Sequence, residues 1–128
     1  MQIKAFRSKG SVQIKVLARD SGASYFHDEF YDDLDSGSEA KKKIEAFIQK
    51  FLENEVLRQT ERNQNLEECS GVDGIYEIKP GDARIYAFQP ADDVFVITNA
   101  QMKSEGRQSD RIALAEERRD RFFSENEV

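Results

Sequence analysis

The chain has 128 residues, a length that suits one domain with a single core. Apolar residues make up 38% and charged residues 34%, and Trp is absent, so we expect a small core under a heavily charged surface. The net charge of −6 repels polyanions at long range, which argues against general nucleic-acid binding. We therefore expect one domain over residues 1–128.

Cysteine, histidine and apolar runs limit the kinds of site that can be expected. Cys69 is the single cysteine, so no intrachain disulfide can form and a reducing compartment is favoured. His27 is the single histidine and has no second His or Cys at metal-ligand spacing, so we predict no metal and no small-molecule cofactor. No run approaches the ~18 apolar residues of a membrane span, and the start of the chain has no apolar signal region, so we predict a cytoplasmic protein without membrane contact.

The first 64 residues are expected to hold two strands and two helices. The run 12–18 alternates apolar and polar side chains, which is typical of a half-buried strand. A weaker apolar run lies at 3–6, and the residues between the two runs have hairpin-turn composition. We therefore predict that the chain begins with a hairpin.

Two helices are predicted after this hairpin. Phe26, Phe30 and Leu34 recur every four residues among acidic side chains, which indicates a short acidic helix with one apolar stripe. Residues 35–38 end this helix and supply the N-cap of the next one. The second helix has apolar residues at helical spacing: Ile44, Phe47, Ile48, Phe51, Leu52 and Val56. The polar residues 58–68 that follow are interpreted as the frayed end of this helix and a loop.

Three consecutive lysines, residues 41–43, lie at the start of the second helix. Such a cluster can contact an anion, although at a helix start it more often forms a solvated face. The sequence leaves both interpretations open.

Residues 72–99 are the most apolar part of the chain and read as an antiparallel meander of three short strands. If Pro80 and Gly81 are the central residues of a two-residue turn, Glu77 faces Arg84. Directly opposed residues share a sheet face. One face then holds Tyr76, Ile78, Ala83, Ile85 and Ala87, and the other holds Ile75, Glu77, Lys79, Arg84, Tyr86 and Phe88.

These two faces suggest different roles. The first is apolar and suited to carry the helices. The second mixes charged and aromatic side chains, which together can grip RNA through phosphate contacts and base stacking. Alternatively, it is a solvated face with a cross-strand ion pair between Glu77 and Arg84.

A polar stretch separates the meander from a helix predicted over residues 109–124. The apolar side of this helix is formed by Ile112, Ala115, Phe122 and Phe123. Its arginines are interleaved with acidic residues, which favours intrahelical ion pairs over a nucleic-acid patch. These arginines are Arg111, Arg118, Arg119 and Arg121.

The order of these elements and three short motifs resemble the RelE/ParE toxin superfamily, in particular its HigB-like and phage-type branch. Residues 71–79 are similar to a family segment in which a Gly is followed by Leu/Ile-Tyr-Glu-Ile/Leu-Arg/Lys. Residues 83–88 are similar to the family's Tyr-Arg-hydrophobic-Tyr-x-Phe strand. Residues 94–97, followed by Lys103 and Arg107, resemble its last strand and Lys-rich loop. The similarity covers roughly residues 71 to 123.

The resemblance implies an α+β fold, with two helices on one face of a twisted antiparallel sheet and a C-terminal helix nearby. It implies the toxin component of a type II toxin–antitoxin-like system, a metal-independent endoribonuclease that cleaves mRNA on the ribosome. The cognate antitoxin, the ribosome and mRNA would be its partners. By position, Arg84 and Lys103 would be catalytic, and Lys79, Tyr86 and Arg107 would bind the substrate.

A second interpretation is a non-catalytic protein-binding module of the same fold. Such a module could be a gyrase-directed ParE-like toxin or a phage-derived regulatory protein. The acidic net charge favours it, and so does Glu77, which stands where relatives often carry a basic residue. The partner would cover the mixed sheet face or the C-terminal helix.

Overall fold

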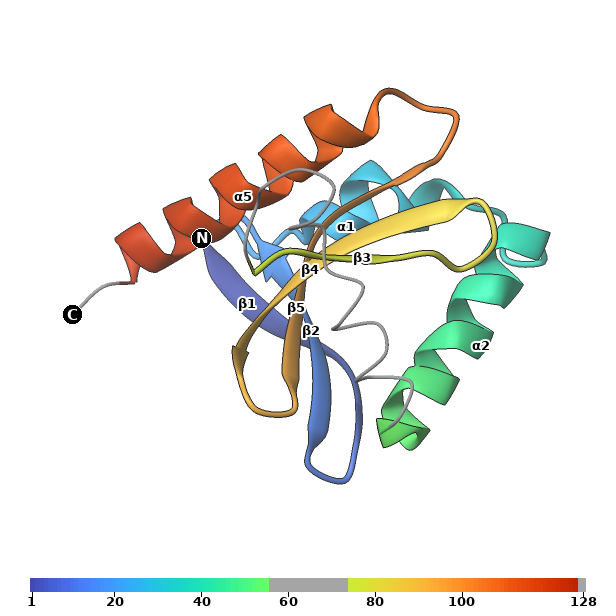
Figure 1. Cartoon of the computed structure of the whole chain (residues 1–128), viewed down its shortest axis with the longest axis horizontal. Coiled ribbons are helices and arrows are strands. Elements are labelled where there is room, and N and C mark those ends of the chain that lie inside the picture. Colours follow the sequence, from blue (N-terminus) through green and yellow to red (C-terminus); the bar gives the residue numbers. More distant parts are fainter. Residues whose placement is uncertain (56–73, 127–128) are drawn as a thin grey trace.

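The computed structural model of the chain describes residues 1–55 and 74–126 (Figure 1). The predictions made for Val56, for the polar stretch 58–68 and for Cys69 lie outside these described residues. The elements in chain order are β1 (Gln2–Lys9), β2 (Val12–Ala18), α1 (Tyr25–Glu29), the 3₁₀ turn η1 (Tyr31–Asp33), α2 (Glu39–Glu53), β3 (Tyr76–Ile78), β4 (Ala83–Ala91), β5 (Val94–Met102) and α5 (Gln108–Glu125).

The predicted α+β class is confirmed, but the sheet is mixed. Its strand order is β1-β2-β5-β4-β3, and β2 runs parallel to β5 from the pair Gln13–Val94 to the pair Val16–Ile97. The other neighbouring strands are antiparallel. The prediction of a wholly antiparallel sheet was therefore wrong. The long connection after β2 leads to the edge strand β3, and the two hairpins that follow bring β5 beside β2 in the same direction.

The N-terminal half follows the predicted pattern except at the first helix. The hairpin and its turn are present, and β1 is longer than the predicted run. Ser38 caps α2 by accepting a hydrogen bond from the backbone N–H of Lys41. The predicted acidic helix is instead two short pieces, α1 and η1, because the backbone leaves helical geometry at Phe30 (φ −147°).

The turn between β3 and β4 differs from the expected one. Gly81 and Asp82 are its central residues, and the N–H of Ala83 donates to the carbonyl oxygen of Pro80 at 3.1 Å. Two-residue hairpin turns favour a positive φ at the first central position. Gly81 adopts a φ of +63°, which the ring of a proline forbids.

This turn moves the strand register by two residues. Glu77 pairs with Tyr86 rather than with Arg84, so the predicted pairing was wrong. Side chains alternate between faces with a period of two, so a two-residue shift leaves every side chain on its expected face. The predicted division of the meander into two unlike faces is therefore confirmed.

Helices cover both faces of the sheet, and each makes its own core. One core lies under α1 and α2 and contains Ile14, Phe26, Ile48, Phe51, Ile85 and Phe95 among others. The other lies under α5 and contains Leu17, Ile75, Tyr86, Phe88, Val96, Ile112 and Ala115. The face expected to be mixed and accessible is thus covered by the C-terminal helix, which lies at the upper left in Figure 1, away from α2 at the right.

Arg118 fixes the middle of α5 to the rest of the fold. Its guanidinium makes a bidentate pair with Glu29 of α1, with both N–O distances at 2.7 Å, and also donates to the carbonyl oxygen of Thr98 at 3.1 Å. Thr98 is the extra residue of a bulge between β4 and β5. The plane of the guanidinium lies over the ring of Tyr25, 3.9 Å from its centroid. An intrahelical ion pair was expected for this arginine, but it is buried and pairs with a carboxylate of another helix.

We expect Arg118→Ala to lower the free energy of unfolding by about 1.5–3 kcal/mol, because it removes charge-assisted hydrogen bonds at a buried site. Arg121→Ala is the matched control on the same helix. Its partner Glu125 is four residues away, and the Arg121 side chain is 62% exposed, so the expected loss is below about 0.5 kcal/mol. Urea denaturation followed by circular dichroism measures both. Equal losses in the two variants would contradict this role of Arg118.

Candidate functional site

A buried polar network lies between β3, β4 and the first turn of α5. The hydroxyl of Tyr86 donates to Glu77 at 2.6 Å and accepts from Arg111 Nε at 2.9 Å. Gln108 Nε2 donates to both carboxylate oxygens of Glu77, at 3.1 and 3.2 Å. Arg111 also donates to the carbonyl oxygen of Gly106. Glu77 is 2% exposed and Tyr86 is fully buried, so these hydrogen bonds replace water.

The network controls the charge of its acid. Burial by itself raises the pKa of Glu77, but the hydrogen bonds from Tyr86 and Gln108 and the charge of Lys79 outweigh it, so the pKa of Glu77 lies below its usual value. Burial raises the pKa of Tyr86 to about 12; Arg111 opposes this shift and Glu77 adds to it. At neutral pH the network therefore contains a carboxylate, a neutral phenol and a guanidinium.

Arg84 lies at the edge of this region, on the β3–β4 turn. Its Nη1 donates to the carbonyl oxygens of Gly81 at 2.9 Å and of Ala83 at 2.8 Å. The expected ion pair with Glu77 does not form, because the register places Tyr86 opposite that carboxylate. Arg84 is partly exposed.

The other predicted cations lie around the same turn. Lys103 donates through its backbone N–H to the carbonyl oxygen of Asp82 at 2.8 Å, and its Nζ lies 3.2 Å from the Asp82 carboxylate. Lys79 Nζ lies 3.5 Å from the carboxylate of Glu77. Gln108 also contacts this carboxylate, and Arg107 is the residue before Gln108. Four of the five predicted site residues thus line one end of the sheet. We call this set the cationic rim: Lys79, Arg84, Lys103 and Arg107.

Tyr86, the fifth predicted site residue, does not join the rim. It lies behind the rim and under α5, with its hydroxyl already engaged on both sides. An RNA base can stack on its ring only if α5 leaves the sheet. The structure therefore brings the predicted cations together and separates the predicted aromatic residue from them.

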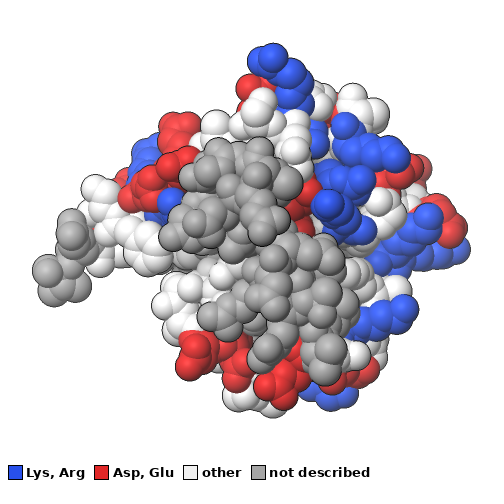
Figure 2. All heavy atoms as spheres, viewed as in Figure 1, with Lys and Arg blue, Asp and Glu red and all other residues white. Residues whose placement is uncertain are grey.

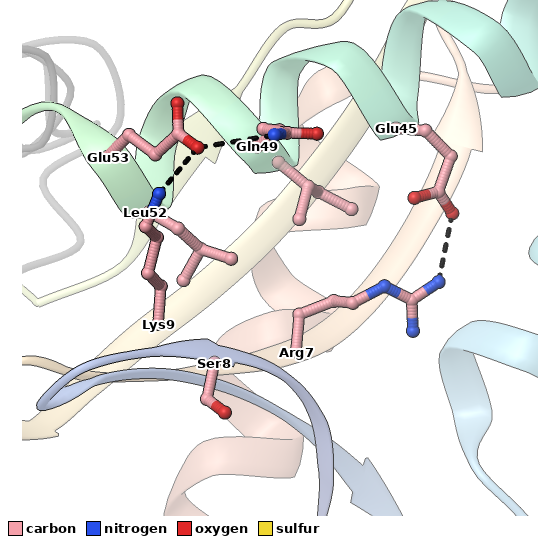
Figure 3. A pocket seen from close by; sticks show the side chains of 8 residues that line it. Arg7, Ser8, Lys9, Glu45, Gln49, Leu52 and Glu53 are labelled. Atoms are coloured by element: carbon pink, nitrogen blue, oxygen red, sulfur yellow. Dashed lines mark hydrogen bonds and ion pairs between the residues drawn. The ribbon is translucent and has the colours of Figure 1, made fainter.

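A polar groove of about 240 Å³ lies elsewhere, between β1 and α2 (Figure 3). Its cations are already matched: Arg7 pairs with Glu45 at 3.1 Å, and Lys9 pairs with Glu53 at 2.8 Å. In Figure 3 these pairs bridge the strand and the helix across the groove. None of the predicted site residues lines it, so it is not part of the candidate site.

Within residues 1–55 and 74–126, no group of His, Cys, Asp or Glu side chains is arranged to hold a metal ion. In the same part of the chain, no helix combines the length and apolar character needed to cross a membrane.

Comparisons with protein-family models, with curated proteins and with solved structures found no match for this chain. The RelE/ParE resemblance therefore rests on the sequence motifs alone.

Sequence reasoning missed the residues that hold the network together. Gln108 was expected in the polar stretch before the C-terminal helix, and Arg111 on a face of that helix away from its apolar side, because helical periodicity counts both as polar. The usable signal was the position of Glu77 between Tyr76 and Ile78 in a β-prone run. A carboxylate there must find donors from whatever element covers that face.

We expect Glu77→Gln to destabilise the fold by about 1.5–3 kcal/mol at pH 7. The lowered pKa of Glu77 gives a stabilising contribution that is fully present above its ordinary value of 4.5 and is lost as the pH falls through the lowered value. Urea denaturation from pH 7 to pH 3 should therefore show the difference between wild type and variant shrinking in acid. Glu117→Gln, on an exposed position of α5, serves as control. A difference that is independent of pH would contradict this assignment.

Proposed function

We propose that this protein is the toxin component of a type II toxin–antitoxin-like system and that it cleaves mRNA on the ribosome. The observation that carries the proposal is the cationic rim. Its four cations come from the three segments that the sequence motifs single out, and they lie at one end of the sheet. Figure 2 shows Lys and Arg side chains gathered on the right of the view, where Figure 1 places the β3–β4 turn.

The proposed chemistry uses the RNA as its own nucleophile. The 2′-OH attacks the adjacent phosphorus and the bond to the 5′ oxygen of the next nucleotide breaks. That oxygen takes a proton from water and leaves as a 5′-hydroxyl, and a 2′,3′-cyclic phosphate remains. Arg84, whose guanidinium is held at the turn, stabilises the charge that develops on the phosphate oxygens. Lys103 supplies a second positive charge, while Lys79 and Arg107 position the strand.

Proton transfer in this scheme needs a group beside the rim that can accept a proton from the 2′-OH. Asp82 is suitably placed, since its carboxylate is exposed on the turn and pairs with Lys103. We assign it the role of general base. Tyr86 takes no part in this scheme while α5 covers it.

We expect Arg84→Ala to reduce cleavage of mRNA on translating ribosomes by about 10²–10³-fold, the usual cost of removing one transition-state donor. Primer extension on mRNA recovered from a purified translation system measures the cuts. Arg84→Lys keeps the charge but loses the planar fork, so an intermediate rate is expected. Arg121→Ala is the control, because it removes an exposed arginine away from the rim. Wild-type protein that leaves no codon-positioned cuts would refute the nuclease.

The alternative is a protein-binding module directed at gyrase or at a regulatory partner. Closure of the mixed face by α5 favours it, because Glu77 and Tyr86 are engaged inside the fold rather than presented to RNA. Phe123 of α5 also favours it, since this large apolar side chain is 47% exposed and contacts Phe88 beneath it.

If the alternative holds, Phe123→Ser should weaken the protein's effect on its target by about tenfold, the effect of losing roughly 1.4 kcal/mol of apolar contact. Inhibition of gyrase supercoiling by the purified protein is the measurement, with Arg84→Ala expected to match wild type. Loss of inhibition in Arg84→Ala, with Phe123→Ser unaffected, would place the contact at the rim instead.

A further inference from the structure

The three lysines at the start of α2 are not explained by the site described above. Lys41 is already occupied, since its Nζ lies over the ring of Tyr31 at 4.5 Å from the centroid. Lys43 is exposed, and its side chain lies directly against the β3–β4 turn. A β-carbon placed on Gly81 would stand 2.7 Å from Lys43 Cδ and 3.6 Å from its Nζ. The absence of a side chain at Gly81 therefore leaves the space that Lys43 occupies.

This packing brings cations from three elements to one four-residue turn. Lys43 of α2 lies against the Cα of Gly81, and Arg84 of β4 donates to the carbonyl oxygen of the same glycine. Lys103 contacts Asp82, the next residue of the turn, through both its backbone and its side chain. The turn thus joins the start of α2 to the cationic rim. In Figure 2 several Lys and Arg side chains lie on the right of the view, interspersed with acidic ones.

Lys43 differs from three of the four rim cations in how its charge is balanced. Lys79 pairs with Glu77, Lys103 with Asp82, and Arg107 with Asp110. Among the described residues, no carboxylate forms an ion pair with Lys43, and the same holds for Arg84, whose acceptors are carbonyl oxygens. An unbalanced lysine on a chain with a net charge of −6 is a local source of attraction for an anion.

We infer that the RNA-binding surface does not end at the rim but crosses the β3–β4 turn onto α2, where Lys43 contacts a phosphate of the bound single strand. The inference rests on the proposed function and extends it, because it adds a contact beyond the cleavage site. Lys43 acts here by its charge and its position, and takes no part in bond breaking. Gly81 serves the surface by letting the lysine lie flat across the turn.

Salt dependence of binding tests this inference directly. Each phosphate contact to a single strand adds about 0.7 to the slope of log K against log salt concentration. The probe is a fluorescent single-stranded RNA of about twelve nucleotides, within the usual range of single-strand site sizes. Fluorescence anisotropy over a series of KCl concentrations gives the slope. We expect Lys43→Gln to reduce it by about 0.7 and Lys43→Arg to leave it unchanged.

Lys50→Gln is the matched control, since Lys50 is an exposed lysine on α2 and lies about 10 Å further along the helix axis. Its slope should equal that of wild type. If wild type binds but Lys43→Gln keeps the wild-type slope, the inference is wrong and the proposed function stands. If wild type shows no salt-dependent binding and Arg84→Ala changes nothing, the proposed function fails together with the inference.

Discussion

The structure depends on how α5 is held against the sheet by two buried arginines. Arg111 reaches the phenol of Tyr86 near the start of the helix, and Arg118 reaches Glu29 and the carbonyl oxygen of Thr98 further along. Burying a guanidinium is unfavourable unless its donors find acceptors, and both arginines find them. Because these acceptors lie on the sheet and on α1, the helix has one well-defined position. The second core, with Ile112 and Ala115, is closed by the same arrangement.

This arrangement divides the former mixed face into an interior and a rim. Where α5 lies, polar groups such as Glu77 become structural, and their partners satisfy them completely. The part of this face that lies past the N-terminal end of α5 is not covered by the helix, and there Arg84 and Lys103 remain accessible. The proposed chemistry is confined to this uncovered part of the face, because there the cations are accessible to solvent and are not needed to close a core.

The sequence predicted those features that depend on local periodicity. Alternation in β2 and helical spacing in α2 determined their buried sides correctly, and the two faces of the meander followed from a period of two. The register of the β3–β4 hairpin depended on which residue of the turn accepts a positive φ, and the pattern of apolar residues carries no information on this. On α5 the sequence placed Ile112 and Ala115 on the buried side correctly, but it could not predict that two arginines are buried there as well, because Arg111 and Arg118 are polar in any hydropathy scale. Their burial depends on Tyr86, Glu29 and Thr98, which are distant in sequence.

The parallel pairing of β2 with β5 has a consequence for how the chain reaches this structure. The strands at the centre of the sheet come from opposite ends of the sequence, with both α2 and the β3–β4 hairpin between them. Neither core can close until that central pair forms, since Ile14 and Leu17 of β2 lie in different cores. The entropic cost of closing this long loop comes before the stabilising contacts between β2 and β5 form, which is characteristic of slowly folding proteins. The N-terminal hairpin, once synthesised, must therefore wait for the last strand of the sheet before it has a partner.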